Sequence, residues 1–268
     1  HGLSAPDPTP YTAVSTYYND FVAGHYDVCI GSWDTFAARY LAGVPIKLLC
    51  GITTAEMIAV LAPKNGAADI PQLKGKIFAG LPSTGTYRMV KAIIQETYGI
   101  DLEKEMTVQG VDNPAASVTL LMADRADAAL SWEPNITTGL QKKPDLRIIF
   151  NAGEAYRKIA NAPLPYFAVA VRNDRLAKSA GYAAKLSKMF EECLSGINAN
   201  PAEAVDLFGS RTGIPPDVMK TAMQSGRLKF TYQPMADAQA RESVVKASEF
   251  LARNGLLPRK VDDGFFAA

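Results

Sequence analysis

Two segments far apart in this chain follow the same order of features. The first reads Phe21-Val-Ala-Gly-His-Tyr-Asp-Val-Cys-Ile-Gly-Ser-Trp-Asp34, and the second reads Leu121-Met-Ala-Asp-Arg-Ala-Asp-Ala-Ala-Leu-Ser-Trp-Glu133. In each, the end of an apolar helix turns sharply into an aspartate that opens a short buried strand. The strand then stops at Ser-Trp-acid, where a new helix begins. This order is common in α/β proteins, so chance similarity is the alternative; taken as related units, the segments predict two similar α/β lobes.

The end of each unit is suited to binding. In open α/β sheets, ligands bind at the carboxyl ends of strands that lead into helices. The free N–H groups and the partial positive charge of a helix N-terminus attract anions and polar groups to this place. Two such edges that face each other form a clamp around a small molecule.

Size and charge agree with a globular protein and exclude several classes. At 268 residues the chain is long enough for two modest domains. The 28 Lys and Arg nearly balance the 27 Asp and Glu, so no basic surplus points to nucleic acid as a partner. Every apolar stretch is interrupted well before the roughly 18 residues of a membrane span. Cys29, Cys50 and Cys193 are interpreted as buried, inert thiols rather than a disulfide or metal site, and we expect no cofactor.

The order of elements changes once along the chain. A helix is expected over residues 10–23, and strands and helices then alternate as far as a β run at residues 165–172. This alternation favours a mostly parallel sheet with helices on both faces. The remaining sequence is almost entirely helical, with little linker before it. We therefore interpret it as the chain returning to complete its first lobe, with residues 56–62 and 166–171 as the two crossings between lobes.

Six short motifs are spread over nearly the whole chain. They are Ala23-Gly-His-Tyr-Asp-Val-Cys-Ile-Gly-Ser32, Val60-Leu-Ala-Pro63, Ile70-Pro-Gln-Leu-Lys-Gly-Lys76, Ser83-Thr-Gly-Thr86, Ala126-Asp-Ala-Ala-Leu-Ser-Trp-Glu-Pro134 and Asn254-Gly-Leu-Leu-Pro258. In this order they resemble the periplasmic substrate-binding proteins of ABC importers of the nitrate/sulfonate/taurine type, a group that also includes binders of thiamine precursors. Singly each motif is weak, and jointly they are fairly specific.

The resemblance implies an α/β, type II-like periplasmic-binding-protein fold, with two lobes, two crossing strands and the ligand in the cleft. Lobe 1 would comprise residues 1–62 and 166–268, and lobe 2 residues 63–165. The family's first strand and helix, which supply one wall of the cleft, are expected to be missing from this chain, and no export signal is visible. The implied protein is a periplasmic monomer without catalytic activity. It would deliver a small anion (sulfonate, nitrate, carboxylate or aromatic acid) to the membrane permease of an ABC importer.

Two other functions remain open. A thiamine-pyrimidine-synthase-like enzyme, or a binder of a pyrimidine precursor, is the alternative closest to the resemblance. The enzymes of this kind use a cysteine-rich iron site, and the cysteines here are not clustered. A cytoplasmic effector-sensing domain with the same fold is the third possibility, and a DNA-binding helix-turn-helix upstream would distinguish it.

The best local candidate for ligand contact is Leu81-Pro-Ser-Thr-Gly-Thr86, where a strand ends and a helix begins. Ser83, Thr84, Gly85 and Thr86 are the expected ligand-binding residues, because two hydroxyls lie where helical N–H groups point outward. The structural alternative is an ordinary cap, in which Ser83 or Thr84 bonds its own helix. Arg88, one turn later, is interpreted as a solvated residue or as the partner of an acidic ligand.

The equivalent edge of the first unit carries Ser32 and Trp33 as expected ligand contacts. Ser32 is alternatively a plain helix cap, and Trp33 is either an aromatic wall or part of the core. Asp34 is interpreted as a first-turn acid that favours the helix dipole.

The third candidate group is Trp132, Glu133 and Tyr166. Trp132 would shield the ligand, and Glu133 would bind a positive ligand group or form a structural ion pair. Tyr166, beside the return crossing, would offer its hydroxyl to the cleft or pack in the hinge.

Overall fold

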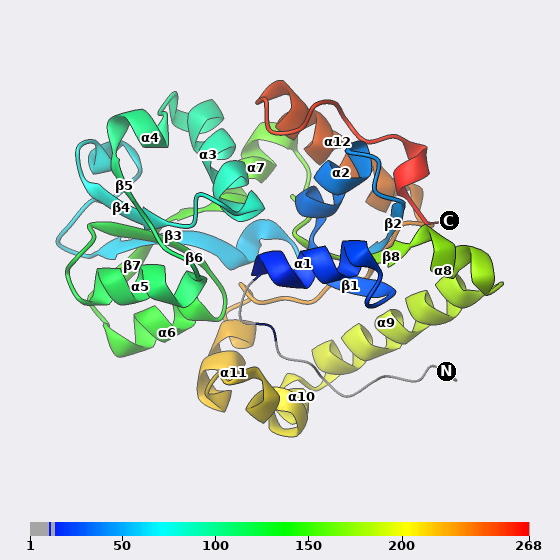
Figure 1. Cartoon of the computed structure of the whole chain (residues 1–268). Helices are drawn as coiled ribbons and strands as arrows, with labels where there is room; N and C mark the ends of the chain where they lie inside the picture. Colours follow the sequence, from blue (N-terminus) through cyan, green and yellow to red (C-terminus); the bar gives the residue numbers. More distant parts are fainter. Residues whose placement is uncertain (1–10, 12–13, 268) are drawn as a thin grey trace.

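The computed structural model describes residue 11 and residues 14–267, and within these residues the chain builds two separate β-sheets (Figure 1). In spatial order, the strands of the first sheet are β1 (Val28–Ser32), β8 (Phe167–Arg172), β2 (Ile46–Gly51) and β9 (Gln233–Pro234). Those of the second sheet are β5 (Thr107–Gly110), β4 (Ile77–Gly80), β6 (Ala128–Trp132), β3 (Ile58–Pro63) and β7 (Leu146–Asn151).

The two echoed strands lie in different sheets, β1 in the first and β6 in the second, as the repeated units predict. The sequence predicts these strands at residues 26–30 and 126–130, and each begins and ends two residues later. Ser32 and Trp132 are consequently the last residues of their strands.

The expectation of mostly parallel sheets is wrong. Among the strand pairs of the described residues, only β4 with β5 and β4 with β6 are parallel. In the first sheet β8 lies between β1 and β2 and is antiparallel to both. In the second sheet β3 lies between β6 and β7 and is antiparallel to both. The reason is topological. The chain enters β3 and β8 from the other sheet, so these strands begin at the edge next to the crossings, where their neighbouring strands end.

The crossings between the sheets are two short extended segments that run side by side. Thr54 and Pro165 form an isolated antiparallel bridge. Next to it, the Ala55 N–H donates to the Leu164 carbonyl at 2.9 Å, and the Tyr166 N–H donates to the Thr53 carbonyl at 3.0 Å. The first crossing therefore precedes the expected residues 56–62, which instead form a 3₁₀ turn (Ala55–Met57) and the second-sheet strand β3.

Helices cover both sheets (Figure 1). Around the second sheet, α3 and α4 lie on one side and α5 and α6 on the other, with α7 following β7. These helices are α3 (Gly85–Tyr98), α4 (Leu102–Glu105), α5 (Pro114–Met122), α6 (Asn135–Lys142) and α7 (Ala152–Ala160). Around the first sheet lie α1 (Val14–Ala23), α2 (Trp33–Leu41), α8 (Asn173–Lys178), α9 (Tyr182–Ala199) and α12 (Ala238–Arg253). Of the helix expected over residues 10–23, residues 10, 12 and 13 lie outside the described residues.

Local signals place α3, the helix that matters most for the site. Thr84 caps its N-terminus by accepting a hydrogen bond from the Tyr87 N–H. Gly99, with a φ of 70°, ends it in the left-handed conformation that glycine adopts without strain. Between these ends, apolar residues spaced for one helical face are fully buried, among them Met89 and Ile93.

The C-terminal helices do not all return to the first sheet. The helices α9 and α12 lie beside it, as expected, whereas α10 (Pro201–Phe208) and α11 (Pro216–Gln224) lie below the boundary between the sheets in Figure 1. The Gln141 amide of α6 donates to the Thr221 hydroxyl of α11 at 3.1 Å. The helical part of the chain therefore bridges both sheets. The largest buried apolar cluster is likewise shared, since it contains both Phe36 of α2 and Phe78 of β4.

Candidate ligand-binding site

The start of helix α2 forms one edge of the candidate site. Ser32 is the N-cap residue of α2, but its hydroxyl donates to the Asp34 carboxylate instead of forming a cap bond. The Ser32 N–H donates to the Tyr18 hydroxyl at 2.9 Å. The N–H of Trp33 donates to the Tyr166 carbonyl at 3.0 Å, which joins α2 to the second crossing segment.

The start of helix α3 forms the opposite edge. The Thr84 hydroxyl donates to the Leu81 carbonyl at 2.8 Å and accepts from the Tyr87 N–H at 3.2 Å. Thr84 thus has the capping role that the sequence left open beside ligand contact. Ser83 is exposed, and Thr86 is buried.

These two helix starts meet directly. A Cβ atom on Gly85 would lie 1.9 Å from Oδ2 of Asp34, so only glycine permits this approach. Arg88 Nη2 lies 3.8 Å from the same carboxylate oxygen. Beside this pair, the Thr86 hydroxyl and the Tyr166 hydroxyl are 2.7 Å apart and hydrogen-bonded. Elements of the first sheet, the second sheet and the crossing segment therefore converge on one point.

The environment of this point is dry. Asp34 is 4% exposed, and burial raises the pKa of its carboxyl, against the opposing effects of the Ser32 hydrogen bond and the Arg88 charge. Burial also raises the pKa of the Tyr166 hydroxyl, whose ring stacks on Phe167 with centroids 4.3 Å apart. The site thus combines one buried carboxylate with neutral hydroxyl groups.

The two tryptophans differ in their surroundings. Trp33 is fully buried in the shared apolar cluster, which agrees with its interpretation as core. Its indole N–H has no hydrogen-bond partner among the described residues. Trp132 is half-buried at the end of β6, opposite Ile58 of β3.

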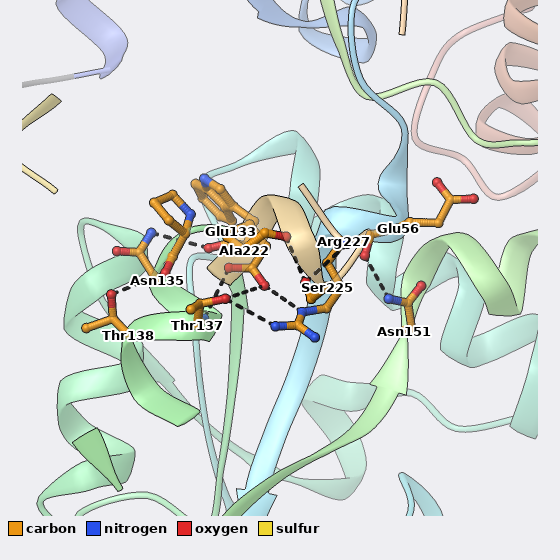
Figure 2. Close-up of polar contacts among 11 residues, drawn as sticks. Glu56, Glu133, Asn135, Thr137, Thr138, Asn151, Ala222, Ser225 and Arg227 are labelled. Atoms are coloured by element: carbon orange, nitrogen blue, oxygen red, sulfur yellow. Dashed lines mark hydrogen bonds and ion pairs between the residues drawn. The ribbon is translucent and has the colours of Figure 1, made fainter. Parts of the chain in front are cut away.

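Glu133 belongs to a second polar cluster, shown in Figure 2. Its fully buried carboxylate accepts hydrogen bonds from the Thr137 N–H at 3.1 Å and from the Thr137 hydroxyl at 3.0 Å. The Arg227 guanidinium donates to it at 2.6 Å and also to the Thr137 hydroxyl at 3.1 Å. The Glu133 N–H donates to the Met57 carbonyl at 2.9 Å. This is the structural ion pair that the sequence left as one of two roles for Glu133.

Of the residues singled out in the sequence, the structure brings together Ser32, Trp33, Gly85, Thr86 and Tyr166, each in contact with a neighbour in the set or with Asp34. Ser83 is exposed and Thr84 caps α3, whereas Glu133 belongs to the separate polar cluster and Trp132 directly precedes it.

Sequence reasoning missed Tyr18 and Arg227, and it gave Asp34 only a helix-dipole role. Tyr18 comes from α1, 14 positions before Ser32, and Arg227 comes from the turn after α11, 94 positions after Glu133. No local sequence pattern identifies Tyr18 as a partner of Ser32, or Arg227 as the partner of Glu133. For Asp34, the glycine at position 85 is the only signal, and it is meaningful only once the two helices are known to meet.

Two of the three cysteines are buried as expected, and the third is not. All three are free; Cys29 and Cys50 are buried, and Cys193 is exposed. Burial raises the pKa of the Cys29 thiol to about 11 and that of Cys50 to about 12, which keeps both protonated and unreactive. Within the described part of the chain, no three His, Cys, Asp or Glu side chains are grouped as metal ligands would be.

Two open cavities lie away from the helix starts. One, of about 490 Å³, is at the amino ends of β4 and β6, lined by Lys76 and Asp127 among others. The other, of about 460 Å³, lies along β7 and α7 and reaches Arg227. Neither is lined by residues of the point where α2 and α3 meet. None of the helices in residues 14–267 combines the length and the apolar character of a membrane span.

Two sheets joined by two adjacent crossings, each sheet with an inserted antiparallel strand, define the periplasmic-binding-protein fold of type II. The chain belongs to the NMT1/THI5-like family, whose model matches residues 10–204. Comparison with curated protein sequences found no match.

Solved structures confirm the fold at low sequence identity. The periplasmic aliphatic sulphonate binding protein SsuA from Escherichia coli is similar with a TM-score of 0.78 and 14% identity, over 96% of this chain and 80% of that one. The alkanesulfonate-binding protein SsuA from Xanthomonas axonopodis pv. citri, bound to MOPS, has a TM-score of 0.74 and 16% identity, over 94% and 83%. The Candida albicans CA3427 gene product has a TM-score of 0.62 and 18% identity, over 94% and 80%.

Proposed function

We propose that this protein is an extracytoplasmic solute-binding protein that holds a small acid between its two lobes and delivers it to the permease of an ABC importer. The ligand class is a sulfonate, nitrate, carboxylate or aromatic acid. The observation that carries the proposal is the meeting of the α2 and α3 N-termini at Tyr166, between two sheets that are joined by two short adjacent crossings. The likeness to the two sulfonate-binding structures supports it.

The mechanism follows from this arrangement. The two crossing segments pair with each other, so they form a natural hinge about which the lobes can separate. When the lobes separate, the α2 and α3 starts become accessible from one opening. When they close on a ligand, helix N–H groups and the Thr86 and Tyr166 hydroxyls supply hydrogen bonds in a water-poor space. We place the lobe boundary at these crossings, close to residues 55 and 165.

The proposal includes binding without turnover and a periplasmic location. A pyrimidine precursor is the second candidate ligand, because the matching family model is of the NMT1/THI5-like type. A thermal-shift screen that includes pyrimidines distinguishes this ligand from an acid.

A thermal-shift screen tests the function directly. The panel comprises sulfonates, nitrate, carboxylates, aromatic acids and pyrimidines, and a ligand that binds only the folded state raises stability by RT ln(1 + [L]/Kd). We expect a saturable rise in Tm for at least one acid, and no chemical change of that acid on prolonged incubation, followed by NMR. Formation of a product, abolished by substitution of Thr86 or Tyr166, would replace binding by catalysis.

The hydroxyls at the start of α3 are tested with the best acid from this screen. Ser83→Ala with Thr84→Ala removes both, and each hydrogen bond to an ionised ligand is worth roughly 1.5–3 kcal/mol, or about one to two decades in affinity. The cap of Thr84 alone is worth about 1 kcal/mol of stability. Weakened binding supports ligand contact at Ser83 and Thr84. A lowered Tm with unchanged affinity assigns Thr84 to capping alone and leaves the ligand to Thr86 and Tyr166.

A further inference from the structure

We propose that the unit formed by α10 and α11, residues 201–224, moves with the second sheet when the lobes separate, although the chain before and after it belongs to the first sheet. The chain on either side of the unit, at residue 200 and at residues 228–230, then supplies two hinges in addition to the two crossings. The inference rests on the proposed function, since it concerns the lobe motion through which a ligand enters.

The first argument is the attachment of α11 to α6. Arg227 donates to the fully buried Glu133 carboxylate at 2.6 Å and to the Thr137 hydroxyl at 3.1 Å (Figure 2). The Ser225 hydroxyl accepts from the Arg227 N–H at 3.3 Å and donates to the Ala222 carbonyl at 2.7 Å, which fixes Arg227 to the end of α11. Separating α11 from α6 leaves the buried Glu133 charge without its cation, which is strongly unfavourable. The helix α11 should therefore stay with α6.

The helix α10 belongs to the same unit. It is joined to α11 by the 3₁₀ turn Gly209–Thr212 and by an ion pair in which Lys220 donates to Asp206 at 2.7 Å. In Figure 1 the two helices lie together below the boundary between the sheets. One non-helical residue, Asn200 with φ −140° and ψ 70°, separates α9 from α10. The unit therefore has a short joint on the side of α9.

The second joint is the place where the chain after α11 changes its attachment. The Leu228 N–H donates to the Ala222 carbonyl at 3.2 Å, which holds Leu228 to α11. The Phe230 carbonyl accepts from the Asn198 amide at 2.7 Å, which holds Phe230 to α9 beside the first sheet. Lys229 lies between these two attachments and is exposed. The backbone can therefore bend at Lys229 while both attachments stay intact.

The second argument is that the contact between α12 and the second lobe is easier to break. Arg253 of α12 pairs with Glu96 of α3 at 2.8 Å, and the two side chains are 53% and 26% exposed, so water can replace this pair. Beside it, the rings of Phe250 and Tyr156 pack with centroids 5.2 Å apart. The buried Tyr156 hydroxyl has no hydrogen-bond partner among the described residues, so separation would hydrate it. The lobes should therefore part between α12 and α3 rather than between α11 and α6.

Distances between spin labels, measured by double electron–electron resonance, test the proposal. The labels are carried by Asp217→Cys on α11, Lys104→Cys on α4 and Lys178→Cys on α8, which are exposed positions. The exposed Cys193 is replaced by serine, and the other two cysteines are buried. The pair 104–178 follows the two lobes. The pairs 217–104 and 217–178 follow α11 relative to the second and the first lobe.

In the ligand-free protein, we expect a narrow distance distribution for the pair 217–104 and broad distributions for 217–178 and 104–178. A saturating concentration of the best acid from the thermal-shift screen should shift the two broad distributions and leave the narrow one in place. The reverse result, a shift for 217–104 with a fixed 217–178 distance, overturns the inference, because α11 then stays with the first lobe.

Two further outcomes separate the inference from the proposed function. Three narrow distributions that a bound acid does not shift overturn the inference and leave binding of the acid standing. If no acid of the screen binds, the proposed function fails, and the ligand-free distributions still decide whether α11 follows the second lobe.

A matched pair of double variants assigns the attachment to the buried ion pair. Glu133→Gln with Arg227→Gln removes both buried charges and should broaden the 217–104 distribution. Glu96→Gln with Arg253→Gln removes the exposed pair and should leave that distribution narrow. A narrow 217–104 distribution in the first variant overturns the role of Arg227 as the tie between α11 and α6. The three label pairs in the protein that keeps all four charges test the motion itself, whether or not the first variant folds.

Discussion

At the scale of single residues, the point where α2 and α3 meet depends on the absence of one methyl group. Gly85 is the first residue of α3, where alanine would be favourable for the helix itself. The Asp34 carboxylate occupies the space that a Cβ would need. The choice of glycine is therefore explained by the contact between two helices and not by the backbone conformation.

Gly85→Ala should keep α3 intact and prevent the two helix starts from meeting as they do here. We expect a larger radius of gyration by small-angle X-ray scattering, and weaker binding of any ligand that bridges the lobes. Gly196→Ala is the control, since Gly196 lies within α9 with open space around its Cα, and it should be neutral or stabilise by up to about 1 kcal/mol. Adding Asp34→Ala to Gly85→Ala should restore the wild-type dimensions. An unchanged radius in Gly85→Ala alone would show that the contact does not hold the lobes.

Asp34 should also control part of the pH dependence of stability. Burial raises the pKa of its carboxyl above the ordinary value, so the folded state prefers the protonated form. For an acid with a raised folded pKa, stability increases as the pH falls from the folded pKa toward the unfolded one. Asp34→Asn should therefore have a higher Tm than the wild type at neutral pH, with the difference shrinking on acidification. A gain of 1 kcal/mol corresponds to about 2–4 °C in a chain of this size. Scanning fluorimetry from neutral to mildly acidic pH checks this, and a lower Tm for the variant at neutral pH would contradict it.

At the scale of secondary-structure elements, two ion pairs connect the C-terminal helices to the second sheet, and their burial differs. Arg227, after α11, pairs with the fully buried Glu133 at the start of α6. Arg253, at the end of α12, pairs at 2.8 Å with Glu96 of α3, and its own side chain is 53% exposed. This partner lowers the pKa of the Glu96 carboxyl. Water competes more with the second pair than with the first, in which Glu133 is fully buried and Arg227 is 23% exposed, so the two ion pairs should differ in strength.

Arg227→Ala should destabilise the protein by about 3–5 kcal/mol, because it leaves the Glu133 charge buried without its cation. Arg253→Ala, the matched control, should cost at most about 1 kcal/mol, as for other exposed pairs. The small contribution of Glu96 is present above the ordinary carboxylate pKa and is lost as the pH falls through its lowered folded value. Urea unfolding of both variants and of Glu133→Gln with Arg227→Ala measures these differences. An equal loss of unfolding free energy in the two arginine variants would show that burial does not decide the strength of these ion pairs.

At the scale of the whole molecule, the two sheets are parts of one folding unit. The largest apolar cluster contains residues from both, including Trp33 beside the first sheet and Phe78 within the second. The crossings are paired with each other, and α11 contacts α6 across the boundary. The core of the molecule is therefore shared between its two sheets.

Calorimetry should therefore show a single unfolding transition, with equal calorimetric and van't Hoff enthalpies. The reason is that unfolding either sheet exposes cluster residues of the other. Arg227→Ala should lower this transition without splitting it. Two separated transitions in the wild-type protein would mean that the lobes unfold independently and that the shared cluster contributes little to stability.

The sequence by itself determined the class of fold and most of its elements. Helix ends can be predicted from the sequence because capping and terminating residues act locally: Pro201 opens α10, and Gly255 follows α12 with a φ of 70°. The echoed Ser-Trp-acid units correctly predicted two sheets, since burial of alternating strands and helices leaves a periodic pattern in the chain. The six family motifs predicted the arrangement of two lobes.

Only the tertiary structure decided what depends on contacts between distant segments. Strand direction in each sheet is set by where a strand enters, so the antiparallel insertion of β3 and β8 has no signature in their apolar sequences. The partner of Glu133 is 94 positions away at Arg227, and the reason for Gly85 is a carboxylate on another helix. The sequence gives the charge of a side chain, but its burial and its partners are properties of the folded chain. Burial and partners decide whether an acid such as Asp34 or Glu133 can contact a ligand.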